Sequence, residues 1–291
     1  MLARTLCMTI SEITRESLDV ALLRKQPGHK YDHGHALILS GGPGQTGAAR
    51  MAARAALRVG AGAVTLGVPP AAQLETAMQV TAIMLQRVPD GAALSEALKD
   101  SRINALCLGP ALGLGARAAE MVKAALAAPH VVLDADAITL LSQDADLRAA
   151  LHPGCVLTPH MGEFARLAPD LAEAATTEGQ GAKAQAARDA ATRFACVILL
   201  KGPETIIATP EGDLRRHRAT QDRATPWLAT AGAGDVLAGL ITGLLARGIA
   251  PVEAATLATW MHAEAALLHG PGLIAEDLPD LMPQVLRDLG V

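Results

Sequence analysis

Aromatic residues are scarce in this chain of 291 residues: Phe, Tyr and Trp together make up 2% of it. Proteins that bind single-stranded nucleic acids usually stack the bases on aromatic side chains, so this class is not expected. The net charge of −4 also provides no basic excess that would attract a nucleic acid or an anionic membrane. We therefore expect a small polar molecule as the partner, and no nucleic acid and no membrane.

Cysteine and long apolar stretches are also in short supply. The four cysteines form no CxxC pair, and three of them lie in apolar runs, which is typical of buried, reduced thiols. The longest stretch free of both charged residues and histidine, 59–74, contains three glycines and a Pro-Pro pair, so it cannot form a membrane-spanning helix of about 20 residues. The first residues mix charged with apolar side chains and lack the apolar segment of a signal peptide. By elimination, the sequence predicts a cytoplasmic protein.

What the sequence does contain is a regular alternation of short apolar runs with Ala-rich stretches that carry charges at helical spacing. This alternation predicts right-handed βαβ crossovers and an α/β fold with a mainly parallel sheet covered by helices. Strands are expected at 35–40, 63–68, 105–109, 130–134, 155–159 and 197–201, a β-hairpin at 204–210 and 213–218, and helices at 48–59, 116–128, 182–194, 235–247, 251–269 and 281–289. We expect one domain over 31–291, preceded by an N-terminal arm or first helix at 1–30.

Polar residues follow several of these strands, and ligands of parallel α/β sheets bind beyond the carboxyl ends of the strands. Asp136, His160, Glu163 and Lys201 are therefore expected at one edge of the sheet. Each also has a simpler interpretation. Asp136 and its neighbour Asp134 favour helix capping over a metal or substrate pair, and His160 with Glu163 fits the first turn of a helix.

Two glycine-rich segments could each bind phosphate, and the sequence supports this for only one of them. The segment 41–47, GGPGQTG, has neither the GxGxxG spacing of a dinucleotide site nor the GK[ST] ending of a phosphate loop, so it favours a tight turn. The segment TAGAGDVLAGLITGLL, 230–245, places Gly232 and Gly234 directly before a helix. Backbone N–H groups at such a helix start bind anions, and Asp235 at the same place could accept a proton from a substrate hydroxyl. The simpler alternative is an aspartate that caps the helix.

At this point the sequence resembles a known family. GAGD before an apolar, glycine-bearing helix is similar to the anion-hole motif of the ribokinase-like superfamily. The segments KYDHGHALILSGG, LCLGPALG, VVLDADAITLL, LTPHMGEFARL and LLKGPETIIATPEG precede it in this order. Together they resemble the ADP/ATP-dependent NAD(P)H-hydrate dehydratase family from about residue 30 to about residue 280. The resemblance implies a three-layer αβα sandwich.

It also implies a reaction in which Asp235 deprotonates the ring hydroxyl of the S epimer of NADH or NADPH hydrate. The hydroxyl is phosphorylated by ADP or ATP, with Mg²⁺ on the phosphates, and phosphate is then eliminated. The resemblance assigns the nucleotide to Lys201, Gly202, Pro203, Glu204, Thr205, Gly232, Ala233 and Gly234, and the hydrate to Ala48, Gly109, Ala111, Gly113, Asp136, His160, Glu163 and Asp235. It suggests no protein ligands for the metal. It further implies a homotetramer and, because no epimerase domain is expected, a separate NAD(P)H-hydrate epimerase as functional partner.

Three positions depart from the family pattern: Pro43 in the first loop, Ala111 in GPALG where GPGLG is usual, and Ala233 in GAGD where GTGD is usual. None of them removes a group that the chemistry needs. Two alternatives stay open. A kinase of a hydroxylated vitamin precursor would use the same Asp235 but release a stable phosphate ester. A non-catalytic sensor of adenylate or nicotinamide nucleotides would not need that base.

Overall fold

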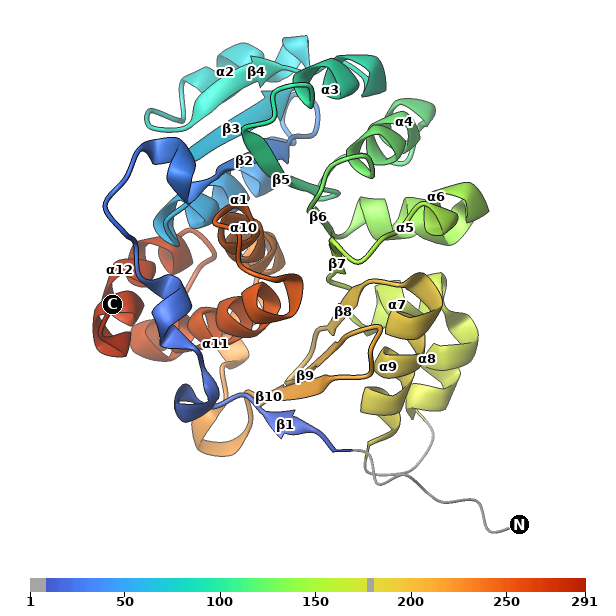
Figure 1. Cartoon of the computed structure of the whole chain (residues 1–291), viewed down its shortest axis with the longest axis vertical. Coiled ribbons are helices and arrows are strands. Elements are labelled where there is room, and N and C mark those ends of the chain that lie inside the picture. Colours follow the sequence, from blue (N-terminus) through green and yellow to red (C-terminus); the bar gives the residue numbers. More distant parts are fainter. Residues whose placement is uncertain (1–8, 177–180) are drawn as a thin grey trace.

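The computed structural model describes residues 9–176 and 181–291, and its centre is a ten-stranded sheet (Figure 1). The strand order is β1-β10-β9-β8-β7-β6-β5-β2-β3-β4. All neighbours pair in parallel except β8 with β9 and β9 with β10. The strands are β1 (Ser11–Glu12), β2 (His35–Leu39), β3 (Ala63–Val68), β4 (Met84–Arg87), β5 (Ile103–Leu108), β6 (Val131–Leu133), β7 (Cys155–Leu157), β8 (Val197–Leu200), β9 (Glu204–Ala208) and β10 (Leu214–Arg218).

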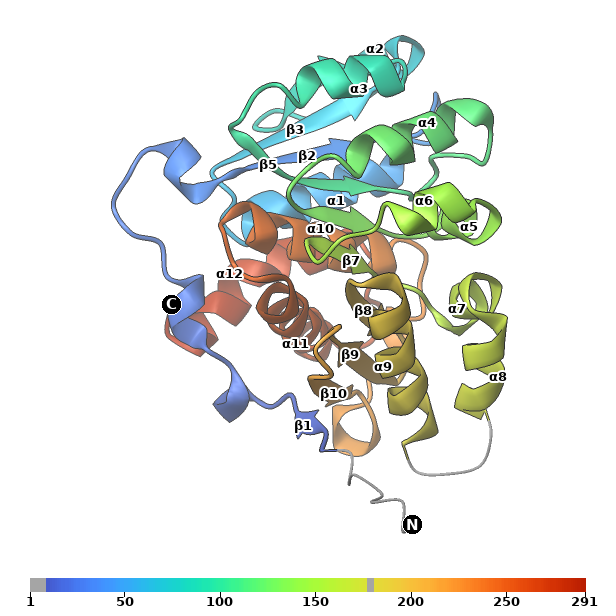
Figure 2. The same cartoon turned by 45° about the vertical axis from the view of Figure 1, so that its right-hand side comes forward.

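Helices cover both faces of this sheet, which gives the predicted three-layer αβα sandwich (Figure 2). Side chains alternate between the faces along each strand. In β2, Ala36 and Ile38 join the core under α1 and α10–α12, whereas Leu37 and Leu39 join the core under α3–α9. The helices are α1 (Gly47–Arg58), α2 (Gln73–Ala77), α3 (Gly91–Ala97), α4 (Ala116–Ala125), α5 (Asp136–Gln143), α6 (Ala145–Ala149), α7 (Met161–Leu167), α8 (Pro169–Thr176), α9 (Ala182–Phe194), α10 (Ala233–Ala246), α11 (Pro251–His269) and α12 (Asp277–Leu289).

The closest helix pair is α1 with α10, and two glycines make this approach possible. A Cβ on Gly239 would lie 2.2 Å from the carbonyl oxygen of Ala52, and one on Gly243 would lie 2.5 Å from that of Ala56. No side chain larger than hydrogen fits at either position without moving a backbone. This contact fixes where α10 begins, and therefore where the GAGD segment lies.

The strand order reverses at β2. The chain runs outward from β2 through β3 to β4, then returns to the other side of β2 to form β5 and continues outward through β6 to β8. The loops that follow β2 and β5 consequently lead to helices on opposite faces of the sheet, α1 and α4. A crevice at such a switch point is where doubly wound sheets bind ligands, so the fold alone places a site there.

The predicted strands and hairpin are confirmed. The sequence missed β4, which is half exposed at the sheet edge and lacks a continuous apolar run, and it missed the short helices α2, α3 and α5–α8. Residues 9–33 form three 3-10 turns and the edge strand β1, which pairs with β10. None of the helices within the described ranges is both long and apolar enough to cross a membrane.

Candidate active site

The GAGD segment forms a turn that opens directly into α10. Gly232 has a φ of 94°, a left-handed conformation that favours glycine, and in the described structure no side chain caps the helix behind it. The turn is held from two sides. The Nε2 of buried His262 donates to the carbonyl oxygen of Ala233 at 2.9 Å, and Met51 packs so closely that a Cβ on Gly232 would lie 2.5 Å from its Cε. Uncapped N–H groups at a helix start form an anion site.

Asp235 lies in the first turn of α10. Burial raises the pKa of Asp235 to about 6, and the negative charges of Asp134 and Glu163 add to this effect while Lys201 opposes it. A carboxylate with a pKa near neutrality is suited to accept a proton in catalysis. Asp235 does not cap the helix, so the simpler interpretation of this residue is wrong.

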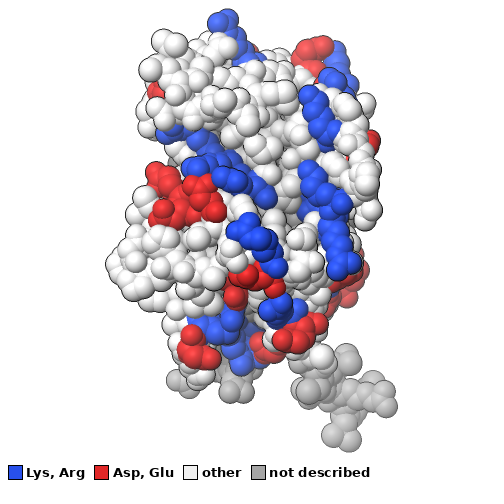
Figure 3. Space-filling model, turned by 90° about the vertical axis from the view of Figure 1, so that its left-hand side faces the viewer, with Lys and Arg blue, Asp and Glu red and all other residues white. Residues whose placement is uncertain are grey.

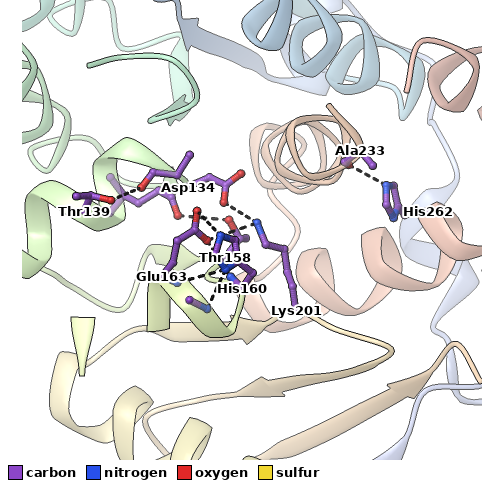
Figure 4. A network of polar contacts seen from close by, with 11 residues as sticks. Asp134, Thr139, Thr158, His160, Glu163, Lys201, Ala233 and His262 are labelled. Carbon is purple, nitrogen blue, oxygen red and sulfur yellow. Dashed lines mark hydrogen bonds and ion pairs between the residues drawn. The ribbon is translucent and has the colours of Figure 1, made fainter. Parts of the chain in front are cut away.

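Lys201 is the cation at the centre of the site. Its Nζ lies 2.8 Å from Oδ1 of Asp134 and 3.9 Å from Oε2 of Glu163, and Figure 4 shows the three side chains converging from the loop after β6, the first turn of α7 and the loop after β8. A Cβ on Gly234 would lie 3.4 Å from the same Nζ. Lys201 thus lies against the anion-binding turn, where it can contact a phosphate.

The segment after β7 forms the N-terminus of α7. Nδ1 of His160 accepts from the N–H groups of Gly162 and Glu163 at 2.9 and 3.3 Å, and Oε2 of Glu163 accepts from the N–H of His160 at 2.8 Å. This reciprocal capping fixes both side chains. The His160 side chain stays 56% exposed whereas that of Glu163 is only 7% exposed. The first-turn role predicted for the pair is confirmed, and it leaves the imidazole free to meet a ligand.

Asp134 and Asp136 flank Ala135, whose φ of 48° is unusual for a residue with a side chain. The turn sends the two carboxylates apart. Asp134 pairs with Lys201, and Oδ2 of Asp136 accepts from the N–H of Gly113 at 2.8 Å. In the described structure neither side chain caps α5, so the capping role favoured from sequence is wrong for both.

The loop after β5 is packed tightly against the loop after β6. A Cβ on Gly109 would lie 1.8 Å from the carbonyl oxygen of Asp134. Ala111 has a φ of 54°, and its carbonyl oxygen would lie 2.1 Å from a Cβ on Gly41. The three loops after β2, β5 and β6 therefore meet at the switch point. Ala48, the second residue of α1, lies at the same edge.

A cavity of about 450 Å³ extends from Lys201 and Gly234 between the hairpin and α11. Its walls are mostly apolar with a few polar groups, the pattern of a cofactor pocket. Glu204 does not line it, because its carboxylate faces Arg216 and Arg218 at 3.6 and 3.5 Å. The lining residues are Lys201, Gly202, Pro203, Thr205, His217, Ala219, Ala224, Thr225, Pro226, Leu228, Ala229, Ala233, Gly234, Leu237, Thr259, His262 and Ala263.

Sequence reasoning missed Lys183, whose Nζ donates to the carbonyl oxygens of Lys201, at 3.3 Å, and Glu204. It holds the turn between β8 and β9 in place. It also missed the two histidines of the cavity wall, His217 and His262; burial lowers the pKa of each to about 4. These residues lie in a predicted strand and in two predicted helices, and no local motif distinguishes them.

The mainly parallel sheet with helices on both faces defines the ribokinase-like fold class. A ribokinase-like superfamily protein from Enterococcus faecalis, 22% identical, matches 96% of this chain with a TM-score of 0.78. The sequence profile of the NAD(P)H-hydrate dehydratase family matches residues 36–281. The chain belongs to this family.

Two relatives and a further solved structure are consistent with membership in this family. The bifunctional NAD(P)H-hydrate repair enzyme Nnr of Moorella thermoacetica is 38% identical over 281 residues, which cover 91% of this chain and 52% of that protein. The ADP-dependent (S)-NAD(P)H-hydrate dehydratase of Neisseria meningitidis serogroup B is 36% identical over 88% of this chain and 86% of its own length. The ADP/ATP-dependent NAD(P)H-hydrate dehydratase of Bacillus subtilis, co-crystallised with ATP/Mg²⁺, is 28% identical, with a TM-score of 0.79 over 97% and 99% of the two chains. The chain spans about half the length of the bifunctional relatives.

Proposed function

We propose that this protein uses ADP or ATP to dehydrate the S epimer of NADH or NADPH hydrate, and thereby restores the reduced nicotinamide. The observation that carries the proposal is the position of Asp235. This buried carboxylate, with a pKa of about 6, stands at the anion-binding turn between the nucleotide cavity and the loops of the switch point. Membership in the dehydratase family favours this reaction over phosphorylation of a vitamin precursor.

The first step is phosphoryl transfer. Asp235 accepts the proton of the ring hydroxyl, and the hydroxyl oxygen attacks the terminal phosphorus of the donor, so that AMP leaves from ADP or ADP leaves from ATP. The N–H groups at the start of α10 and the ammonium of Lys201 stabilise the negative charge on the transferred group. Asp134 and Glu163 hold that ammonium in place.

The second step is elimination. The bond between ring carbon and oxygen breaks, and its electron pair leaves with phosphate while the lone pair of the ring nitrogen supports the departure. A proton is lost from the neighbouring ring carbon, and the ring double bond returns. Phosphate leaves far more readily than hydroxide. The role of the phosphoryl donor is therefore to convert the hydroxyl into a better leaving group. A kinase-type site thus catalyses a net lyase reaction.

The residues present fit a magnesium ion carried by the nucleotide. Within the described ranges no cluster of three or more His, Cys, Asp or Glu side chains could hold a metal, and Mg²⁺ commonly binds through phosphates, water and one or two carboxylates. Asp134 and Glu163, which both face Lys201, are the acids that would meet it. When bound, the ion neutralises charge on the donor phosphates.

The test is recovery of reduced-nicotinamide absorbance when the protein is mixed with NADH hydrate, magnesium and either ADP or ATP. We expect recovery only with nucleotide, with inorganic phosphate released in step, and none with Asp235→Asn. Glu211→Gln, which neutralises an exposed acid of the hairpin turn, should behave as wild type. A folded protein that binds ADP but restores no absorbance would overturn the proposal. A phosphorylated vitamin precursor formed instead would establish the kinase.

A further inference from the structure

A second cavity, of about 750 Å³, forms a groove between α1 and α12. It opens at the catalytic edge of the sheet, where Gly47 lies next to Ala48, and follows α1 as far as Arg58. The segment 79–83, which precedes β4, forms its third wall. The lining residues are Gly47, Arg50, Met51, Arg54, Leu57, Arg58, Gln79, Val80, Thr81, Ala82, Ile83, Glu276, Pro279, Pro283 and Leu286.

Three arginines of α1 line this groove at intervals of four residues, so they share one face of the helix. Arg54 and Arg58 share the single carboxylate of Asp280, at 2.6 and 2.9 Å. Arg50 is different: among the described residues it forms no ion pair, and its Nε is buried without a hydrogen-bond partner. Figure 3 shows a band of Lys and Arg side chains across the face of the molecule that carries α12.

Two acids lie in the surroundings of Arg50, Glu75 and the groove residue Glu276, and among the described residues neither forms an ion pair with it. Glu75 is close enough for the charge of Arg50 to help lower its pKa, although hydrogen bonds from Thr46 and Gly44 contribute more. Its two carboxylate oxygens accept from Oγ1 of Thr46 at 2.6 Å and from the N–H of Gly44 at 2.9 Å. Arg50 thus presents a guanidinium that has no ion-pair partner among the described residues, at the end of the groove that lies beside the catalytic edge. Such a group binds phosphate in a bidentate manner.

Met51 connects this groove to the reaction centre. It lines the groove, and its side chain packs on Gly232 of the anion-binding turn. The Met51 side chain therefore lies between the groove and the anion-binding turn. The cavity beside α11 receives the phosphoryl donor, so the diphosphate and adenosine of a dinucleotide substrate need another path out of the centre. The groove begins where that path must begin, and its volume is in the range of ligand pockets.

We propose that the groove binds the adenosine diphosphate half of the dinucleotide hydrate, with Arg50 contacting its diphosphate and the apolar wall of Leu57, Val80 and Ile83 receiving the adenosine. This assignment rests on the proposed function. It makes Arg50 a residue that recognises dinucleotide substrates. It also predicts that a hydrate of reduced nicotinamide riboside, which lacks both the diphosphate and the adenosine, gains nothing from the groove.

The test compares NADH hydrate with the hydrate of reduced nicotinamide riboside in Arg50→Met. We expect KM for NADH hydrate to rise about tenfold, the loss typical of one charge-assisted contact, whereas KM for ADP and all parameters for the riboside hydrate stay within about twofold. Arg50→Lys should fall between Arg50→Met and wild type. Arg166→Met, which removes an exposed arginine of α7, is the matched control and should leave every value unchanged.

A second variant changes Ala82, in the wall of the groove formed by residues 79–83. Ala82 is exposed, so Ala82→Glu should fold normally, and its negative charge should raise KM for NADH hydrate as Arg50→Met does. An equal loss with both hydrates, a raised KM for ADP, or an unchanged KM for NADH hydrate in both variants would overturn the assignment.

Direct binding separates this assignment from the proposed reaction. Calorimetric titration with NADH in the presence of ADP should show about tenfold weaker binding to Arg50→Met than to wild type. If the wild type binds NADH through Arg50 but restores no hydrate, the reaction fails and the groove stands. If NADH binding does not depend on Arg50, the groove assignment fails whatever the activity.

Discussion

Replacing Asp235 by Asn is expected to make the protein more stable while it abolishes catalysis. Burial and two neighbouring carboxylates raise the pKa of Asp235 from 3.8 to about 6, so the folded protein disfavours the ionised form relative to the unfolded chain. Above pH 6 the native state carries this charge at a cost, and below pH 4 the carboxyl is protonated in both states. The destabilisation therefore grows as the pH rises from about 4 to about 6 and is complete above that.

The size of the effect follows from the shift. One pKa unit corresponds to about 1.4 kcal/mol, so a rise from 3.8 to about 6 costs up to about 3 kcal/mol at pH 8. Asn keeps the shape and removes the charge, so the variant should recover most of this free energy. In a chain of this length that is a rise in Tm on the order of 5 °C.

The assay is thermal unfolding followed by circular dichroism at pH 4 and pH 8, beside the nucleotide-dependent recovery of NADH. The gain in Tm should be present at pH 8 and absent at pH 4. Glu211→Gln, an equal change of charge on an exposed turn, controls for net charge and should leave Tm unchanged at both. A variant that is equally or less stable at pH 8, or a gain that does not depend on pH, would refute the reasoning.

Three other results are expected. In the wild type, kcat/KM should fall about tenfold per pH unit below pH 6, because Asp235 must be ionised to accept the proton; a pH–rate profile measures this. Lys183→Met removes the cation that holds the turn after β8, so steady-state kinetics should show KM for ADP rising several-fold with KM for the hydrate unchanged. Gly239→Ala places a methyl group 2.2 Å from the carbonyl oxygen of Ala52, so urea unfolding should show a loss of about 1–3 kcal/mol.

Much of the fold could be predicted because its signals are local. Each central strand of the sheet is almost continuously apolar, and the helices with a charged face were recognised from their spacing. β4 escaped because MLQR, at the sheet edge, is not apolar throughout. The bounds of the helices α5–α8 were not predicted because these helices are short. No single periodic pattern covers them.

The site could be predicted only where a motif is continuous in sequence. The GAGD turn was found with Asp235 in its place, whereas Asp134 was interpreted as a cap. Its partner Lys201 lies 67 residues further along the chain, and only the order of β6, β7 and β8 in the sheet brings the two together. Lys183 was missed for the same reason, since it contacts the active-site turn from the first turn of α9.

Ala111, which stands where the family pattern has glycine, shows that alanine can adopt the left-handed backbone conformation usually taken by glycine. Ala111 takes a φ of 54° and Ala135 one of 48°, conformations that cost of order 1–3 kcal/mol for residues with a side chain. The first lets the β5 loop pack on Gly41 through its carbonyl oxygen, and the second directs Asp134 and Asp136 to different partners. Strain in two turns thus places the carboxylates, and neither motif matching nor a count of glycines contains that information.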